Sequence, residues 1–177
     1  MWLLRGVLLL LCLCWMPAGA VELRDPDTHF FDPTLGDFQE ELENARAQGK
    51  KGIMIFFEMD ECPFCHRMRE TVLNRADVQD YFRRHFLLFK VDIEGDVEIL
   101  DFQGRPTTEK EFAFRQFRVR ATPVIAFFDL DGRLVARYTG ATRDAQEFLW
   151  LGEYVAEGAY REMPFARYKR MKRSGAP

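Results

Sequence analysis

The chain has 177 residues, of which 47% are apolar and 14% aromatic, so it is large and apolar enough to bury the core of one ordinary domain. This composition excludes an intrinsically disordered chain and a coiled coil. Lys and Arg number 25 against 28 Asp and Glu, and the formal charge of −3 gives no sign of a nucleic-acid-binding surface. We therefore expect one globular domain and no nucleic-acid partner.

The first 20 residues have the pattern of a secretory signal peptide. An arginine near the start is followed by a leucine-rich run over 7–13, too short to cross a bilayer comfortably, and by small residues that end at Ala20. We predict cleavage after Ala20 and export to the periplasm or beyond, with an uncleaved membrane anchor as the alternative. A lipoprotein fits less well, because Cys12 and Cys14 each follow a leucine where lipid attachment favours a small residue.

Removal of this leader leaves two of the four cysteines, Cys62 and Cys65. Exported proteins often use cysteines as structural disulfides. A bridge between residues three apart, however, closes so short a loop that it stabilises a fold by only about 2 kcal/mol. We therefore interpret the pair as reactive rather than structural.

The rest of the chain alternates helix and strand patterns. Apolar residues at helical spacing predict helices, and continuous apolar runs predict strands buried on both faces. In chain order we expect a polar, turn-rich lead over 25–36, a helix over 38–49, a strand over 52–57, a helix over 63–74, a second helix through Val78, Phe82 and Phe86, a strand over 87–91, a hairpin within 97–107, a helix from Thr108 through Phe117 with Thr108 and Glu111 as a capping box, strands over 124–128 and 134–138 joined by an Asp-Gly turn, and a helix over 144–159. This order predicts an α/β sandwich of three layers, with a mixed central sheet flanked by helices. The domain spans 21–163, and the basic tail over 164–177 is expected to be disordered.

The motif Cys62-Pro63-Phe64-Cys65 stands where the first strand gives way to a helix. In the first turn of a helix, unpaired backbone N–H groups and the positive end of the helix dipole favour a thiolate. Pro63 suits this turn because its missing N–H is not needed there. We therefore expect Cys62 to attack a disulfide and Cys65, about one helical turn further on, to resolve the mixed disulfide.

Side chains around this motif act on the thiol in opposite directions. His66 would add positive charge, whereas Glu58, Asp60 and Glu61 disfavour a thiolate. Phe64 is expected to present an apolar contact to the substrate.

Three segments together resemble the thioredoxin superfamily. They are the buried strand that ends in Cys-Pro-Phe-Cys, the stretch Ala121-Thr122-Pro123-Val124 with its following apolar run, and the Asp131-Gly132 turn. The resemblance covers about 38–155, and within the superfamily the chain is similar to exported proteins of the SoxW type and to the C-terminal domain of DsbD.

This resemblance implies a thioredoxin-like fold and thiol:disulfide oxidoreductase activity, with no cofactor beyond the Cys62–Cys65 disulfide. It implies that Thr122–Pro123 is a cis peptide facing that disulfide, where Pro123 aligns the substrate backbone. The implied substrates are disulfide-containing exported proteins, and the implied electron donor is a membrane thiol carrier of the DsbD or CcdA type.

The sequence departs from the thioredoxin pattern in two respects. Thioredoxins have Trp-Cys-Gly-Pro-Cys, whereas Glu61 precedes Cys62 here and Pro-Phe separates the cysteines, as in glutaredoxin-like or DsbA-like proteins. Thioredoxins also bury an acid six residues before the first cysteine, and that position is Phe56 here. Glu58 is the nearest candidate to replace this acid and help deprotonate Cys65.

Other functions fit parts of the motif. The same fold can act as an oxidase or isomerase, which the Pro-Phe dipeptide permits. Copper(I) accepts few and soft ligands, so the pair could also hold this ion for delivery. Cys-X-X-Cys followed by His66 is also the c-type haem attachment pattern, although the rest of the chain is unlike a small cytochrome. Zinc needs four ligands, and only three histidines accompany the two sulfurs, so we predict no metal site.

Overall fold

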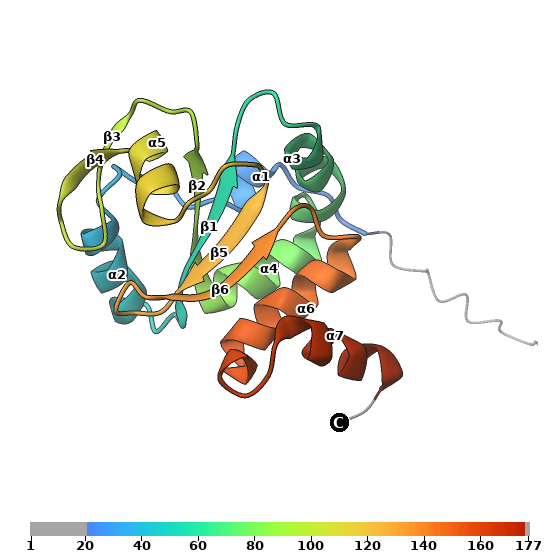
Figure 1. Cartoon of the computed structure of the whole chain (residues 1–177). Coiled ribbons are helices and arrows are strands. Elements are labelled where there is room, and N and C mark those ends of the chain that lie inside the picture. The colour runs from blue at the N-terminus through green and yellow to red at the C-terminus, as the bar shows by residue number, and fades with distance from the viewer. Residues whose placement is uncertain (1–20, 176–177) are drawn as a thin grey trace, which may run out of the picture.

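The computed structural model describes residues 21–175 and consists of a central sheet between two layers of helices (Figure 1). The predicted signal peptide and its cleavage site lie outside the described residues. The strands β1 (Gly52–Glu58), β2 (Phe86–Asp92), β5 (Val124–Phe128) and β6 (Leu134–Thr139) form the sheet in the order β2-β1-β5-β6. Strands β1 and β2 are parallel, while β5 is antiparallel to both β1 and β6. The fold is therefore the α/β sandwich with a mixed sheet that the sequence predicts.

The helices are α1 (Pro26–His29), α2 (Phe38–Ala47), α3 (Pro63–Met68), α4 (Ala76–His85), α5 (Glu109–Glu111), α6 (Ala145–Ala156) and α7 (Phe165–Ser174). Helices α2 to α6 follow the predicted order, while α1 and α7 were not predicted. Helices α3 and α5 continue as π-helical segments over Arg69–Leu73 and Phe112–Gln116, and a 3-10 turn covers Ala159–Arg161. The predicted hairpin is present as β3 (Glu98–Leu100) and β4 (Pro106–Thr108). Of the predicted capping box the structure shows one half: the Thr108 side chain accepts the N–H of Glu111, while the Glu111 carboxylate pairs with Arg115. Phe86 begins β2 instead of ending the preceding helix.

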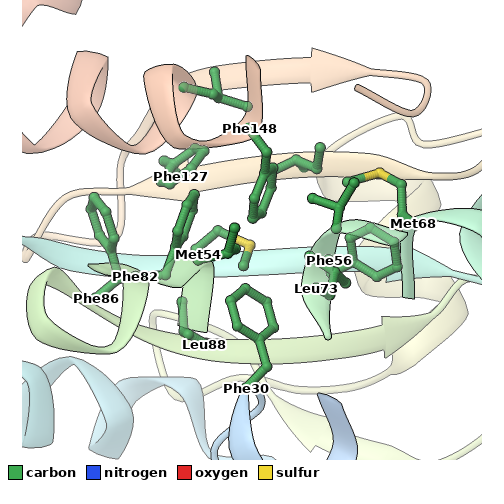
Figure 2. Packing of buried hydrophobic residues seen from close by; sticks show 14 of the residues in the cluster. Phe30, Met54, Phe56, Met68, Leu73, Phe82, Phe86, Leu88, Phe127 and Phe148 are labelled. Carbon is green, nitrogen blue, oxygen red and sulfur yellow. The ribbon is translucent and has the colours of Figure 1, made fainter. Parts of the chain in front are cut away.

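Each central strand buries side chains on both faces, as its continuous apolar run predicts. Along β1, Met54 and Phe56 pack into the core beneath α3, α4 and α6 (Figure 2), while alternate residues pack into a second core beneath α2 and the β3–β4 hairpin. In the first core Phe82 and Phe148 stack with ring centroids 4.2 Å apart and join α4 to α6. The two cores hold β1 and β5 side by side, and this arrangement positions the loops at their ends.

The polar lead before α2 contributes more to the core than its sequence indicates. Phe30 is fully buried and Phe31 nearly so, and both belong to the core that contains Met54 and Phe56. Figure 2 shows Phe30 in this core. Asp32 then covers the outer edge of β2: its backbone N–H donates to the Leu88 carbonyl at 2.7 Å, and its carboxylate accepts the Leu88 N–H at 2.9 Å. The lead therefore satisfies polar groups of a strand edge that would otherwise be open.

The prediction that the tail over 164–177 is disordered is wrong for most of its length, because α7 packs against α6. Tyr168 is only 6% exposed, lies 5.4 Å from Tyr154 ring to ring, and donates its hydroxyl to Glu157 at 2.8 Å. Lysines of α7 pair with acids of α6, including Lys172 with Glu153 at 2.8 Å. The basic run is ordered because its partners lie on another helix. Within residues 21–175, no helix combines the length and apolar character needed to span a membrane.

Candidate active site

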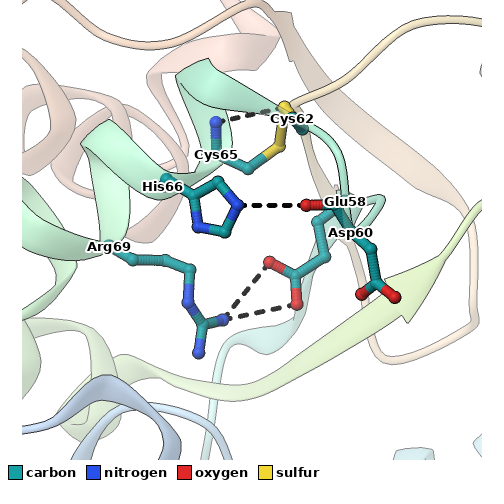
Figure 3. Close-up of a disulfide and its surroundings, with 6 residues drawn as sticks. All are labelled: Glu58, Asp60, Cys62, Cys65, His66 and Arg69. Carbon is teal, nitrogen blue, oxygen red and sulfur yellow. Dashed lines mark hydrogen bonds and ion pairs between the residues drawn. A yellow bond between two sulfur atoms is a disulfide. The ribbon is translucent and has the colours of Figure 1, made fainter.

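The two cysteines lie where β1 ends and α3 begins, and they form a disulfide with their Cα atoms 5.2 Å apart (Figure 3). Cys62 is the N-cap residue of α3, and its Sγ accepts the backbone N–H of Cys65 at 3.1 Å. Pro63 occupies the first helical turn, as predicted. One of the free N–H groups at the start of the helix is therefore aimed at the Cys62 sulfur, where it stabilises a thiolate after reduction.

The segment with the predicted cis-proline reaches the same edge of the sheet. The Thr122–Pro123 peptide is cis. Because Val124 pairs with Phe57 in antiparallel register, Pro123 lies beside the end of β1, from which the chain continues to the cysteines. Pro123 is buried, and the Thr122 hydroxyl has no hydrogen-bond partner within the described part of the chain. The fold thus brings together two motifs that are some sixty residues apart in the sequence.

Phe64 faces outward between the two cysteines. Its side chain is 60% exposed, which is unusual for a phenylalanine in a chain that buries most of its aromatic rings. The Arg67 guanidinium lies 6.0 Å from the centre of the Phe64 ring and also donates to the Thr142 carbonyl at 3.2 Å. Phe64 is therefore accessible to a partner, and its contact with substrate stays a prediction.

His66 is bonded to the loop rather than to sulfur. Its Nε2–H donates to the Asp60 carbonyl at 3.0 Å, as Figure 3 shows. Within residues 21–175, the hydrogen bond to Cys62 Sγ comes from the Cys65 backbone and not from a cationic side chain. His66 thus holds the loop that precedes Cys62.

Glu58, at the end of β1, is turned into the structure and only 18% of its side chain is exposed. Its carboxylate accepts two hydrogen bonds from Arg69 Nη1, at 3.2 and 3.3 Å (Figure 3). Burial raises the pKa of Glu58, and the positive charges of Arg69 and Lys90 only partly oppose this effect. Glu58 is therefore easier to protonate than an ordinary glutamate.

A pocket of about 210 Å³ connects Glu58 with the second cysteine. Its lining residues are Glu58, Met59, Asp60, Cys65, His66, Arg69 and Lys90. Cys65 and Glu58 line the same small space, and within it the Glu58 carboxylate is bonded to Arg69. That Glu58 replaces the missing buried acid stays a prediction.

The partners of Glu58 come from separate elements of the fold and were not predicted from the sequence. Arg69 also bonds Asp27 of α1, and Lys90 of β2 bonds the same carboxylate at 2.8 Å. Burial tends to raise the pKa of Asp27, but the hydrogen bonds from Lys90 and Arg69 outweigh it and hold this pKa below its ordinary value. Arg69 follows Cys65 by four residues and so lies on the same helical face. This spacing was the one feature of the sequence that could have indicated Arg69 as a neighbour of the site.

The donor atoms needed for metal or haem are engaged in this structure. Copper(I) binding and haem attachment both require the two sulfurs as thiols, and they are joined here. Across residues 21–175, no three His, Cys, Asp or Glu side chains are grouped as metal ligands.

A disulfide between cysteines three apart, at the start of a helix and at the same sheet edge as a cis-proline, defines a thioredoxin-fold thiol:disulfide oxidoreductase. The chain belongs to the thioredoxin-like family, since the family model described as a thioredoxin-like domain matches residues 38–156. A search of the curated proteins finds no match.

Solved structures agree with this assignment of the fold. A thioredoxin-fold protein from Helicobacter pylori is 21% identical, with 72% of this chain and 88% of that chain covered and a TM-score of 0.59. A putative disulphide-isomerase from Bacteroides thetaiotaomicron is 26% identical, with coverages of 73% and 95% and a TM-score of 0.56. The oxidised C-terminal domain of DsbD from Neisseria meningitidis is 19% identical, with coverages of 70% and 97% and a TM-score of 0.50. The predicted fold and the likeness to DsbD are confirmed, while the likeness to SoxW stays a prediction.

Proposed function

We propose that this protein is exported and reduces disulfides of other exported proteins. The observation that carries the proposal is the environment of Cys62, whose Sγ accepts an N–H of α3 beside the exposed Phe64. The leader pattern over 1–20 supports the location, and family membership supports the chemistry.

The reaction begins from the reduced pair. The Cys62 thiolate attacks one sulfur of a substrate disulfide that lies along Thr122 and Pro123, and the other substrate sulfur leaves as a thiolate. Cys65 then loses its proton and attacks Cys62 Sγ, which breaks the mixed disulfide and releases the second substrate thiolate. The substrate gains two electrons and two protons, and the protein returns to the Cys62–Cys65 disulfide that the structure contains.

The charges around Cys62 support the reductive direction. A strongly oxidising dithiol has a stabilised thiolate in its reduced form. Here His66 bonds the Asp60 carbonyl instead of sulfur, and two exposed acids, Asp60 and Glu61, precede Cys62. Among residues 21–175, one backbone N–H donates a hydrogen bond to Cys62 Sγ, so little offsets the effect of these negative charges on the Cys62 thiolate.

The oxidised pair must be reduced again after each cycle. In an oxidising compartment the electrons have to come from inside the cell, and we propose a membrane thiol carrier of the DsbD or CcdA type as the donor. The electrons pass between sulfur atoms throughout, so the proposed cycle uses no other cofactor.

Trapping the mixed disulfide tests the two cysteine roles. With Cys65→Ser, we expect a reduced variant to form a stable covalent complex with a disulfide substrate such as insulin, because the resolving thiol is gone. Cys62→Ser is the matched control and should trap little or nothing. A stable complex of Cys62→Ser, with none for Cys65→Ser, would reverse the assignment.

A further inference from the structure

The outer face of α7 carries a row of arginines that the redox site does not use. Arg167, Arg170 and Arg173 follow one another at intervals of three residues and are all exposed. At about 1.5 Å of rise per residue, the row is about 9 Å long. No ion pair or hydrogen bond of these three side chains is formed with any other described residue.

The lysines of the same helix behave differently. Lys169 pairs with the buried Glu147 of α6 and lies 5.5 Å from the Phe165 ring, while Lys172 pairs with Glu153. The lysines thus attach α7 to the domain, and the arginines remain on the side turned to solvent. Packing of α7 accounts for the lysines but leaves the arginines unexplained.

The charge of the chain is divided in the same way. Helix α7 has five Lys and Arg and no acid, whereas residues 21–164 have 28 Asp and Glu against 19 Lys and Arg. An acidic body with one basic helix orients itself in the field of a negatively charged surface, with α7 toward that surface.

We propose that the Arg167–Arg170–Arg173 face of α7 binds the surface of a bilayer that contains anionic phospholipids. Guanidinium groups form paired hydrogen bonds with phosphate oxygens, and a plane of phosphates needs no matching shape. The exposed residues of α7 are Ala166, Arg167, Arg170, Arg173, Ser174 and Gly175 at its end.

The composition of this face distinguishes the lipid surface from a protein partner. Protein interfaces have an apolar or aromatic centre, but the exposed side chains of α7 include no large apolar group, and its aromatic residues Phe165 and Tyr168 contact α6 and β6 instead. The binding is therefore electrostatic and peripheral, without insertion of side chains into the acyl region. A nucleic acid, which is a long polyanion, would extend past the short row onto the acidic body.

Vesicle cosedimentation tests this inference with residues 21–177, which contain both hydrophobic cores and the whole described fold. We expect the protein to bind vesicles of phosphatidylcholine with phosphatidylglycerol at low ionic strength, not to bind phosphatidylcholine alone, and to dissociate as salt is added. Each basic residue near an anionic membrane contributes about fivefold to the affinity. The variant Arg167→Gln/Arg170→Gln/Arg173→Gln lacks three of them and should therefore bind roughly 100-fold more weakly.

The matched control removes the same charge elsewhere. Arg46→Gln/Arg84→Gln/Arg133→Gln changes three exposed arginines on α2, α4 and the turn before β6, and it should bind like the wild type within a fewfold. Equal loss in both triple variants would show that net charge alone matters and would overturn the proposal. So would the absence of wild-type binding to phosphatidylglycerol vesicles, or binding to DNA or to an acidic protein in its place. The test does not involve the cysteines, so its failure leaves the proposed reaction untouched.

Discussion

Glu58 is the candidate proton acceptor for Cys65, and this role is a prediction. Its pKa is raised by burial, so it takes up a proton more readily than a solvated carboxyl, and it shares a pocket with Cys65. Cys65 must lose a proton before it can resolve the mixed disulfide. Hydrogen bonds from the Arg69 guanidinium hold the Glu58 carboxylate in place.

We predict that Glu58→Gln slows the resolution step at neutral pH by on the order of tenfold, at the low end of typical general-base effects. The difference should fade as the pH rises above about 8.5, where a thiol ionises without help. Rapid-mixing measurements of mixed-disulfide decay against pH provide the readout. Asp60→Asn is the control, because Asp60 lines the same pocket but is exposed. An unchanged rate in Glu58→Gln, or equal slowing in Asp60→Asn, would remove Glu58 from the mechanism.

Asp101 is a second buried carboxylate, but its role is structural. It is 1% exposed and accepts backbone N–H groups from Gln103 and Arg105 at 2.8 and 3.0 Å, together with side-chain bonds from Arg105 and Gln116. Burial tends to raise the pKa of Asp101, but these hydrogen bonds outweigh it and hold the pKa below its ordinary value. The carboxylate therefore organises the β3–β4 hairpin.

We predict that Asp101→Asn lowers the free energy of unfolding by about 2–3 kcal/mol at pH 7. The amide N–H groups of Asn would face the N–H donors of Arg105 and Gln116, so these donors would lose their acceptor. Since the folded-state pKa lies below the unfolded one, the stabilisation is present above about pH 4 and is lost as the pH falls further. Urea unfolding at pH 7 and pH 3 checks both statements. A difference that persists unchanged at pH 3 would contradict the account of this residue.

Local sequence was sufficient to predict that Cys62 stands at the start of a helix with Pro63 in its first turn, because these residues belong to a short contiguous pattern. The cis peptide before Pro123 was expected only from the resemblance to thioredoxins. The Glu58 network was not predictable in this way. It joins β1 to Arg69 after α3 and to Asp27 in the lead, and contacts between separate elements leave no periodic trace in a single sequence.

Secondary-structure elements were predictable from the sequence where their own residues carry the pattern, and not where their order depends on another element. The strands of the sheet were recognised because burial on both faces produces an unbroken apolar run, as in β1 and β5. The charge of residues 164–177 predicts a solvated, disordered tail, whereas the structure forms helix α7 there. Its order comes from an acidic and aromatic face on α6, including Glu147, Glu153 and Tyr154, which sequence patterns of α7 itself do not show.

We predict that Tyr168→Ala lowers the free energy of unfolding by about 2–4 kcal/mol, since it removes a buried ring from the contact between α7 and α6. Arg170→Ala lies on the outer face of the same helix and should change it by less than about 0.5 kcal/mol. Urea denaturation of both variants provides the measurement. If the two variants were equally stable, α7 would not be part of the cooperative fold.

At the scale of the whole molecule, the two hydrophobic cores bring the cysteines and the cis-proline to the same edge of the sheet. The cores cover opposite faces of the sheet and hold β1 next to β5 in antiparallel register, so the end of β1 and the start of β5 meet. The cysteines follow β1, and the cis-proline precedes β5. Hydrophobic periodicity alone predicted the layers, whereas the strand order and the meeting of these two loops were expected only from the resemblance to thioredoxins.

The equilibrium of the Cys62–Cys65 pair with glutathione or dithiothreitol buffers tests the central claim most directly. Metal-free protein lacking residues 1–20 would be equilibrated across a range of buffer potentials, and the fraction of free thiol would be trapped and quantified. A reductase requires a potential near that of thioredoxin, about −270 mV, and this is the value that the weakly stabilised Cys62 thiolate predicts. A potential near that of DsbA, about −120 mV, would make the protein an oxidant and contradict the proposed direction of electron flow.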